Sequence, residues 1–304
     1  MNKENLQEKL IENMAAFVGL VSMKLPKDVE DKLKELSEKE TNPLAKTIFE
    51  TMKKNQELAW EMKRPSCQDT GVLQFFCEVG EDFPLRANLE ELLKEATYKA
   101  TMETPLRHNS VETFKEYNTG KNVGNGTPSV FVKMVPNSSK ARIYTYMAGG
   151  GCSLPGAGVT LMPGEGYEAV VKFILDRMTS YGLNACPPLL VGVGIGTSIE
   201  TAAMNSKLAL MRKVGSHNED ERARDLEKRL EDGINKIGIG PQGFGGENSV
   251  MGVNIVNTAR HPSVLSVALN VGCWSHRRGL IELDEEMNYE ILSHEGIELW
   301  VKKF

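Results

Sequence analysis

The chain has 304 residues, of which 40% are hydrophobic and 25% charged, and its formal net charge is -5. These values fit a globular protein with its own core and lend little electrostatic support to nucleic-acid binding. The five cysteines are an odd number and follow no secretory signal, which indicates reduced thiols. No apolar run approaches the roughly 18 residues needed to span a bilayer, so we expect a cytoplasmic protein that binds neither membrane nor nucleic acid.

The first part of the chain, residues 1–64, predicts a helical segment with Pro26 and Pro43 near first turns. The polar loop RPSCQDTG follows, and the apolar run after it has the length of a strand. Residues 87–104 predict another helix, and the Gly- and Asn-rich stretch at 118–129 predicts an exposed loop.

Strand-like and helical runs alternate through the rest of the chain. The helical runs include a charged span at 216–236, which is typical of a solvated helix. This alternation predicts an α/β or α+β fold, with one domain over residues 1–304 and its core at 65–285. The strand-like runs are SVFVKMVP, ARIYTYMAGGG, LLVGVGIG, MGVNIVN and RHPSVLSVALNVGCW.

The stretch NACPPLLVGVGIGTSIE places glycines at 192, 194 and 196, between an apolar run and a predicted helix. A strand, a glycine turn and a helix can hold a phosphate, but the spacing matches neither G-x-G-x-x-G nor a P-loop. Close packing of strand on helix is the better interpretation. A nucleotide-binding oxidoreductase remains the competing class of enzyme.

The cysteines differ in their surroundings. Cys77 lies inside an apolar strand, which predicts a buried core residue. In contrast, Cys67, Cys186 and Cys273 each lie in or beside a turn. Cys152, on a glycine turn, is ambiguous. No C-x-x-C is present, which disfavours a zinc knuckle. Three thiolates from distant loops still suffice for a cubane iron-sulfur cluster with one iron lacking a protein ligand, which is one option among several.

Cationic residues occur in the three loops PLRHNS, ARHPS and SHRRG. Guanidinium groups bind carboxylates bidentately, so such loops would suit a small dicarboxylate. Asp69, two residues after Cys67, is a candidate for proton transfer or for orienting the base, and an Asx turn is the alternative.

Several long motifs occur in a characteristic order. Together they resemble the alpha-type catalytic domain of the iron-sulfur hydro-lyases, the family that includes class I fumarases and L(+)-tartrate dehydratase. The resemblance runs from the helical opening to about Gly279. The motifs are CQDTG at 67, LRHN at 106, MAGGG at 147, CPPLLVGVGIG at 186, IGPQGFGG at 239, RHPS at 260 and GCWSHRRG at 272.

The resemblance implies a helical N-terminal segment followed by a mixed α/β catalytic domain, and a [4Fe-4S] cluster. It implies that Asp69 and His261 are catalytic. The implied cluster ligands are Cys67, Cys186 and Cys273. The implied substrate contacts are Gln68, Asp69, Arg107, Gly150 and His261.

In this family a second domain completes the active site, and we expect it here on a beta subunit, in a heterotetramer of two alpha and two beta chains. The stretches GGGCSLPG and GCWSHRRG depart from the fumarase pattern and are similar to the tartrate dehydratase branch. The expected reaction is therefore dehydration of a C4 hydroxy-dicarboxylate, L(+)-tartrate to oxaloacetate and water. The alternative is interconversion of malate and fumarate, and a non-catalytic iron-sulfur scaffold is a further rival.

Overall fold

The computed structural model describes residues 2–300, which divide into two compact units. The first unit contains the residues up to Lys27, Asn55–Gly149 and the residues from Arg277 onward. The second unit contains Asp28–Lys54 and Gly150–His276. Within the described residues, no helix combines the length and the apolar character needed to cross a membrane.

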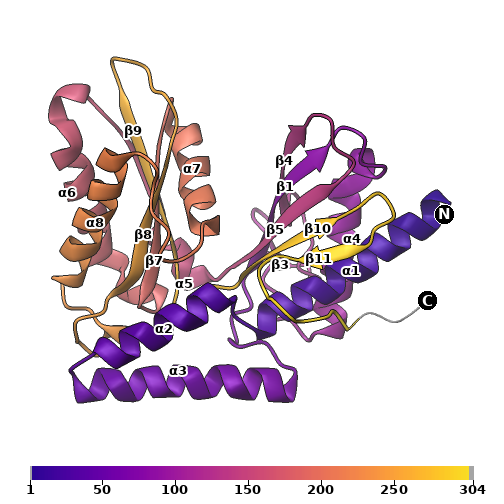
Figure 1. Cartoon of the computed structure of the whole chain (residues 1–304), viewed down its shortest axis with the longest axis horizontal. Helices are drawn as coiled ribbons and strands as arrows, with labels where there is room; N and C mark the ends of the chain where they lie inside the picture. Colours follow the sequence, from indigo (N-terminus) through magenta and orange to yellow (C-terminus); the bar gives the residue numbers. More distant parts are fainter. Residues whose placement is uncertain (1, 301–304) are drawn as a thin grey trace. The chain divides into compact units, whose positions relative to one another are not determined.

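The first unit is built on a five-stranded sheet with the strand order β11-β10-β5-β1-β4 (Figure 1). Strand β1, between β5 and the edge strand β4, runs parallel to β4 and antiparallel to β5. Alternate residues of β1, such as Phe75 and Val79, are fully buried and pack in one core with Phe17 of helix α1. The elements of this unit are α1 (Lys3–Met23), β1 (Val72–Gly80), η1 (Arg86–Asn88), α4 (Leu89–Glu103), β4 (Ser129–Val135), β5 (Ala141–Ala148), β10 (Arg278–Leu283) and β11 (Tyr289–Ile291).

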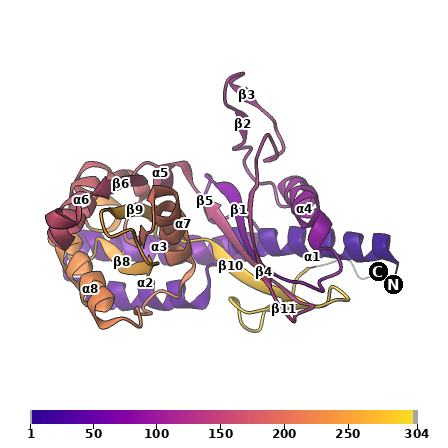
Figure 2. The same ribbon diagram turned by 90° about the horizontal axis from the view of Figure 1, so that it is seen from above.

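A short hairpin in the first unit, β2 (Val111–Glu112) with β3 (Tyr117–Asn118), extends away from the five-stranded sheet (Figure 2). Phe114 at its tip is fully exposed. The loop after the hairpin is not exposed throughout, because Asn122 is only 3% exposed. The Gly- and Asn-rich stretch therefore contains an anchored residue that its composition did not reveal.

The second unit is a four-stranded sheet of order β6-β9-β7-β8 with helices on both faces. Helix α7 covers one face, and α6 and α8 cover the other (Figure 1). The elements are α2 (Lys27–Lys39) apart from its first residue, most of α3 (Pro43–Met62), α5 (Gly150–Ser153), β6 (Ala157–Leu161), η2 (Pro163–Glu165), α6 (Gly166–Tyr181), η3 (Leu183–Ala185), β7 (Leu189–Gly196), α7 (Ile199–Met211), α8 (Glu221–Asn235), η4 (Pro241–Gly243), β8 (Val250–Asn257) and β9 (Leu265–Gly272).

Three glycines of β7 let the backbone of α7 lie directly on the strand. A Cβ added to Gly194 would lie 1.9 Å from the Ala202 carbonyl oxygen, and one added to Gly192 would lie 2.3 Å from the Ser206 carbonyl oxygen. Gly196 is the last residue of the same strand. The packing role predicted for these glycines is thus confirmed, and they form no turn that could hold a phosphate.

The predicted class, a helical N-terminal segment followed by an α/β fold, is also confirmed by α1 to α3 and the two sheets that follow. Strands β10 and β11 extend the first sheet beyond the last strand-like run of the sequence.

Candidate active site

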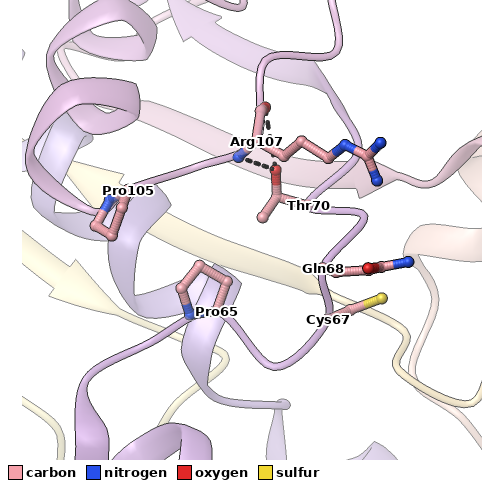
Figure 3. A pocket seen from close by; sticks show the side chains of 6 residues that line it. All are labelled: Pro65, Cys67, Gln68, Thr70, Pro105 and Arg107. Atoms are coloured by element: carbon pink, nitrogen blue, oxygen red, sulfur yellow. Dashed lines mark hydrogen bonds between the residues drawn. The ribbon is translucent and has the colours of Figure 1, made fainter.

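The loop between α3 and β1 carries the first predicted cluster ligand, Cys67, which is partly exposed. The side chains of Cys67, Gln68 and Arg107 extend to the same side of this loop (Figure 3). They border a cavity of about 540 Å³. The residues lining it are Pro65, Cys67, Gln68, Thr70, Pro105 and Arg107, all from the first unit.

Thr70 fixes the backbone at Arg107. Its hydroxyl accepts a 3.1 Å hydrogen bond from the Arg107 amide and lies 3.4 Å from the Arg107 carbonyl oxygen. The guanidinium of Arg107 is exposed and has no hydrogen bond or ion pair to any residue in the described range 2–300. The loop therefore presents a cation at the cavity without neutralising it.

Asp69 forms the Asx turn that the sequence left as an alternative. Its Oδ1 accepts a 3.0 Å hydrogen bond from the Gly71 amide and a 3.1 Å bond from Nδ2 of Asn109. Asn109 also donates to the Gly71 carbonyl at 3.2 Å. The carboxylate is thus held in one orientation by groups up to 40 residues away.

Asn122 is a buried residue whose role the sequence did not suggest. Its Oδ1 accepts from the Asn109 amide at 2.6 Å, and its Nδ2 donates to the Arg107 carbonyl at 2.9 Å. The backbone at Asn122 is left-handed, with φ of 56°. Asn109 and Asn122 therefore position the Asp69 and Arg107 loops. The signal in the sequence that could have singled out Asn122 is its residue type, because asparagine adopts the left-handed conformation more readily than most residues.

The second predicted ligand, Cys186, occupies a left-handed turn in the second unit, with φ of 57° and ψ of 72°. Such a conformation is uncommon for a residue other than glycine. The Pro187 carbonyl next to it accepts hydrogen bonds from the main-chain amide (2.9 Å) and the Nε2 (3.3 Å) of Gln242. The IGPQGFGG loop thus supports the turn, and Cys186 is exposed.

The third predicted ligand, Cys273, directly follows β9 and is 8% exposed. The amide of the next residue, Trp274, donates a 3.1 Å hydrogen bond to the Cys186 carbonyl. The Cys273 thiol donates to the Ser275 carbonyl at 3.4 Å. Two of the three predicted ligands therefore lie on turns that are bonded directly to each other.

The structure does not bring His261 to these turns. His261 precedes β9 and Cys273 follows it, so the length of an eight-residue strand, roughly 26 Å at about 3.3 Å per residue, separates them. The Nδ1 of His261 accepts from the Ser263 amide at 3.1 Å, which leaves the proton of a neutral ring on Nε2. Arg260 stabilises its own turn, because its Nη1 donates hydrogen bonds to the carbonyls of His261, Pro262 and Val264.

Gly150, the remaining predicted contact, is the exposed first residue of α5. Cys67 belongs to the first unit, whereas Cys186 and Cys273 belong to the second. Across residues 2–300, no three His, Cys, Asp or Glu side chains are gathered as a metal-binding group.

Comparison with known proteins assigns the chain to a family. The sequence profile described as fumarate hydratase (Fumerase) matches residues 11–282. The chain belongs to the fumarate hydratase (Fumerase) family. It is 50% identical over 293 residues to the L(+)-tartrate dehydratase subunit alpha of Escherichia coli (strain K12), covering 96% of this chain and 97% of that one. It is equally similar to the same subunit of Escherichia coli strain UTI89.

A more distant member comes from Methanocaldococcus jannaschii. This putative L(+)-tartrate dehydratase subunit alpha is 33% identical over 268 residues, which covers 86% of this chain and 94% of that one. The family and these relatives indicate a hydro-lyase. The resemblance recognised from the motifs is thereby confirmed.

Two cysteines outside the predicted ligand set have different surroundings within the family fold. Burial raises the pKa of the Cys77 thiol to about 12, in the core of the first unit. Such a thiol stays protonated at neutral pH and is a poor ligand. Cys152, on α5, is also buried, and it lies near Lys207, whose pKa is lowered by burial despite that thiol. Cys77 is core, as its sequence context predicted.

Proposed function

We propose that the chain is the alpha subunit of a [4Fe-4S]-dependent hydro-lyase that dehydrates L(+)-tartrate to oxaloacetate and water. The observation that carries this proposal is one cavity bordered by the cysteine Cys67, the side-chain amide of Gln68 and the exposed guanidinium of Arg107, to which no described residue is paired. That combination suits a hydroxy-dicarboxylate beside a metal centre. Similarity over 96% of the chain to subunits named for tartrate dehydration supports the choice of substrate.

The proposed cluster ligands are Cys67, Cys186 and Cys273. The donor chemistry fits, because all three thiols lie in turns and the deeply buried Cys77, with its raised pKa, is excluded. Three thiolates leave one iron of a cubane without a protein ligand. When bound, such a cluster supplies a Lewis-acidic iron that makes the substrate hydroxyl a better leaving group.

The protein's own groups bind and orient the substrate in this proposal. Arg107 binds one carboxylate through its guanidinium, and the exposed Gln68 donates its amide beside it. Asp69, whose Oδ1 is held by Gly71 and Asn109, moves the proton at the neighbouring carbon or orients the group that does so. The negative charge that develops on the adjacent carboxylate is stabilised by the guanidinium of Arg107, whose backbone is held by Thr70 and Asn122.

Gly150 and His261 complete the proposed substrate contacts. The backbone amide of a glycine can approach a ligand closely. The Nε2 proton of His261 suits a carboxylate oxygen, although this ring lies at the opposite end of β9 from Cys273. His261 therefore needs its own test, in which His261→Gln raises the KM for tartrate without changing the iron content. Unchanged kinetics would remove His261 from the set.

The proposal includes a partner. The relatives are named as alpha subunits, which implies a second kind of subunit in those enzymes. We propose a beta subunit here too, in a heterotetramer of two alpha and two beta chains. The alpha chain then acts as one catalytic domain over residues 1–304, with a core at 65–285. Native mass spectrometry of the co-expressed chains measures this stoichiometry.

The test of function uses the chain co-expressed with its partner and purified without oxygen. We expect about four irons and four sulfides per alpha chain, as the cluster formula requires. We also expect a higher kcat/KM for L(+)-tartrate than for malate. The match to the fumarate hydratase profile favours malate and fumarate as the second candidate pair.

Two outcomes would contradict the proposal. An iron-free protein that NAD(P) or ATP stabilises would refute it. A protein that binds a cluster but turns over no dicarboxylate would instead be a non-catalytic iron-sulfur scaffold.

A further inference from the structure

Arg277 is a buried cation of the SHRRG loop, one of the three cationic loops in the sequence, and the family resemblance gives it no individual role. It is 2% exposed and is the largest of the fully buried side chains. It directly precedes β10, and its carbonyl accepts a 3.1 Å hydrogen bond from the Met147 amide near the end of β5. The backbone of Arg277 is therefore fixed to the strand that leads into the glycine motif.

Two of the three guanidinium nitrogens of Arg277 lack a hydrogen bond from the described part of the chain. Its Nε and Nη1 are buried and have no hydrogen-bond partner among residues 2–300. Burying a charge without a partner is costly, because the lost hydration is not replaced. A guanidinium keeps its proton, so it cannot escape this cost by becoming neutral. Orphaned donors of this kind call for an acceptor from outside the described residues.

The guanidinium lies beside Asp69. A Cβ added to Gly149 would lie 3.0 Å from the Asp69 Oδ2 and 3.8 Å from the Arg277 Nη2. Both side chains thus converge on the space above one glycine, and all three residues belong to the first unit. Arg277 forms no ion pair with Asp69, whose Oδ1 is held by Gly71 and Asn109. The cation and the carboxylate thus lie near the same glycine without forming an ion pair.

We infer that Arg277 binds one carboxylate of the substrate next to Asp69, while Arg107 binds the other. This inference rests on the proposed function and deepens it. The exposed side chain of Arg107 can move to meet anions of different shapes. The buried side chain of Arg277 cannot move in this way, so it requires a carboxylate at one fixed position. A ligand without a second carboxylate leaves the Nε and Nη1 donors unpaired, so Arg277 confers selectivity for dicarboxylates.

The test uses the complete two-subunit holoenzyme with Arg277→Gln and Arg277→Lys, and with Arg86→Gln as a control at an exposed arginine of the same unit. Succinate and butyrate serve as unreactive inhibitors with two carboxylates and one. We expect Arg277→Gln to raise the KM for tartrate and the inhibition constant of succinate at least about tenfold, which is the scale of a lost charged hydrogen bond. The constant for butyrate should change less than about twofold on the same scale.

Arg277→Lys retains the positive charge but loses the bidentate donors of the guanidinium. It should therefore raise the KM for tartrate and the inhibition constant of succinate by a smaller factor. If Arg277→Gln does not fold, the Arg277→Lys variant replaces it in these measurements. Guanidinium chloride at millimolar concentration should partly restore an Arg277→Ala enzyme, a rescue that a purely structural role would not give. The iron and sulfide contents should match those of the unaltered enzyme in every variant.

Equal changes for succinate and butyrate, or a KM within twofold of the unaltered enzyme, would overturn the inference. Loss of iron in Arg277→Gln would overturn it too, because the guanidinium would then serve the cluster. Calorimetric binding of succinate separates this inference from the proposed function. An unaltered complex that turns over no tartrate or malate refutes the function, whereas equal succinate affinity with and without Arg277 refutes only the carboxylate site.

Discussion

The main-chain amide of Trp274 donates a 3.1 Å hydrogen bond to the carbonyl of Cys186. This bond joins two turns that lie 88 residues apart in the sequence, the difference between positions 274 and 186. Each turn carries one of the cysteines that we propose as cluster ligands. The second unit therefore presents two thiols from one hydrogen-bonded structure, without any C-x-x-C motif.

Serine substitutions test the proposed ligands one at a time. Cys67→Ser, Cys186→Ser and Cys273→Ser should each lose the brown cluster absorbance or the activity, because an alcohol is a far weaker iron ligand than a thiolate. The measurements are the visible spectrum, the iron content and the turnover of the anaerobic complex. Cys77→Ser is the control and should keep its cluster, although it places a hydroxyl in the core. A Cys186→Ser enzyme with a full cluster and full turnover would disprove the assignment.

Thiol reactivity should separate Cys77 from Cys186 in the cluster-free protein. With a pKa of about 12, the Cys77 thiol is ionised to only about one part in 10⁴ at pH 8, and it is also buried. Cys186 is exposed. Iodoacetamide at pH 8, followed by peptide mass spectrometry, should label Cys186 long before Cys77. Urea should abolish the difference, and equal rates in the folded protein would contradict the burial of Cys77.

Gly194→Ala should destabilise the second unit. The added methyl would lie 1.9 Å from the Ala202 carbonyl oxygen, and neither β7 nor α7 can move without breaking backbone contacts. We expect a loss of about 3 kcal/mol or more in the free energy of unfolding, at the upper end of overpacking effects. Urea denaturation measures it. Gly164→Ala is the matched control, because its methyl would meet nothing within 4 Å. Equal stability of the two variants would show that the strand and helix are not in direct contact.

Glu227 should be a large contributor to the stability of the second unit. It is 2% exposed, and its carboxylate accepts from Arg212 at 2.7 Å and from the amides of Ile255 and Asn218 at 2.7 and 3.0 Å. Glu227→Ala removes the acceptor of the Ile255 and Asn218 amides and the carboxylate partner of Arg212, which costs on the order of 3–5 kcal/mol for a buried pair.

The control for Glu227 is Glu168→Ala, which also removes an arginine partner. Glu168 binds Arg229 on the surface, where both side chains are exposed. Water replaces that interaction, so we expect little change in the urea midpoint. If the two substitutions had similar effects, the carboxylate of Glu227 would have to be solvated in solution.

The sequence by itself determined the class of fold, the family and the contrast between the turn cysteines and Cys77. Helix and strand patterns depend on neighbouring residues, and the family motifs are contiguous, so both can be read along the chain. The glycines of β7 were also interpreted correctly, because alternating glycines in a strand leave few other roles than close packing.

Only the tertiary structure showed which distant residues hold the family motifs in place. Asn109 and Asn122 hold the loops of Asp69 and Arg107 through bonds between segments 13 to 40 residues apart. Glu227 looked like one charge in a solvated helix until the fold buried it.

The ends of β9 separate His261 from Cys273, as the strand-like run had implied, whereas packing alone left Arg277 buried with donors that no residue in the described range pairs. Such burial and pairing arise from contacts between segments that no local pattern specifies.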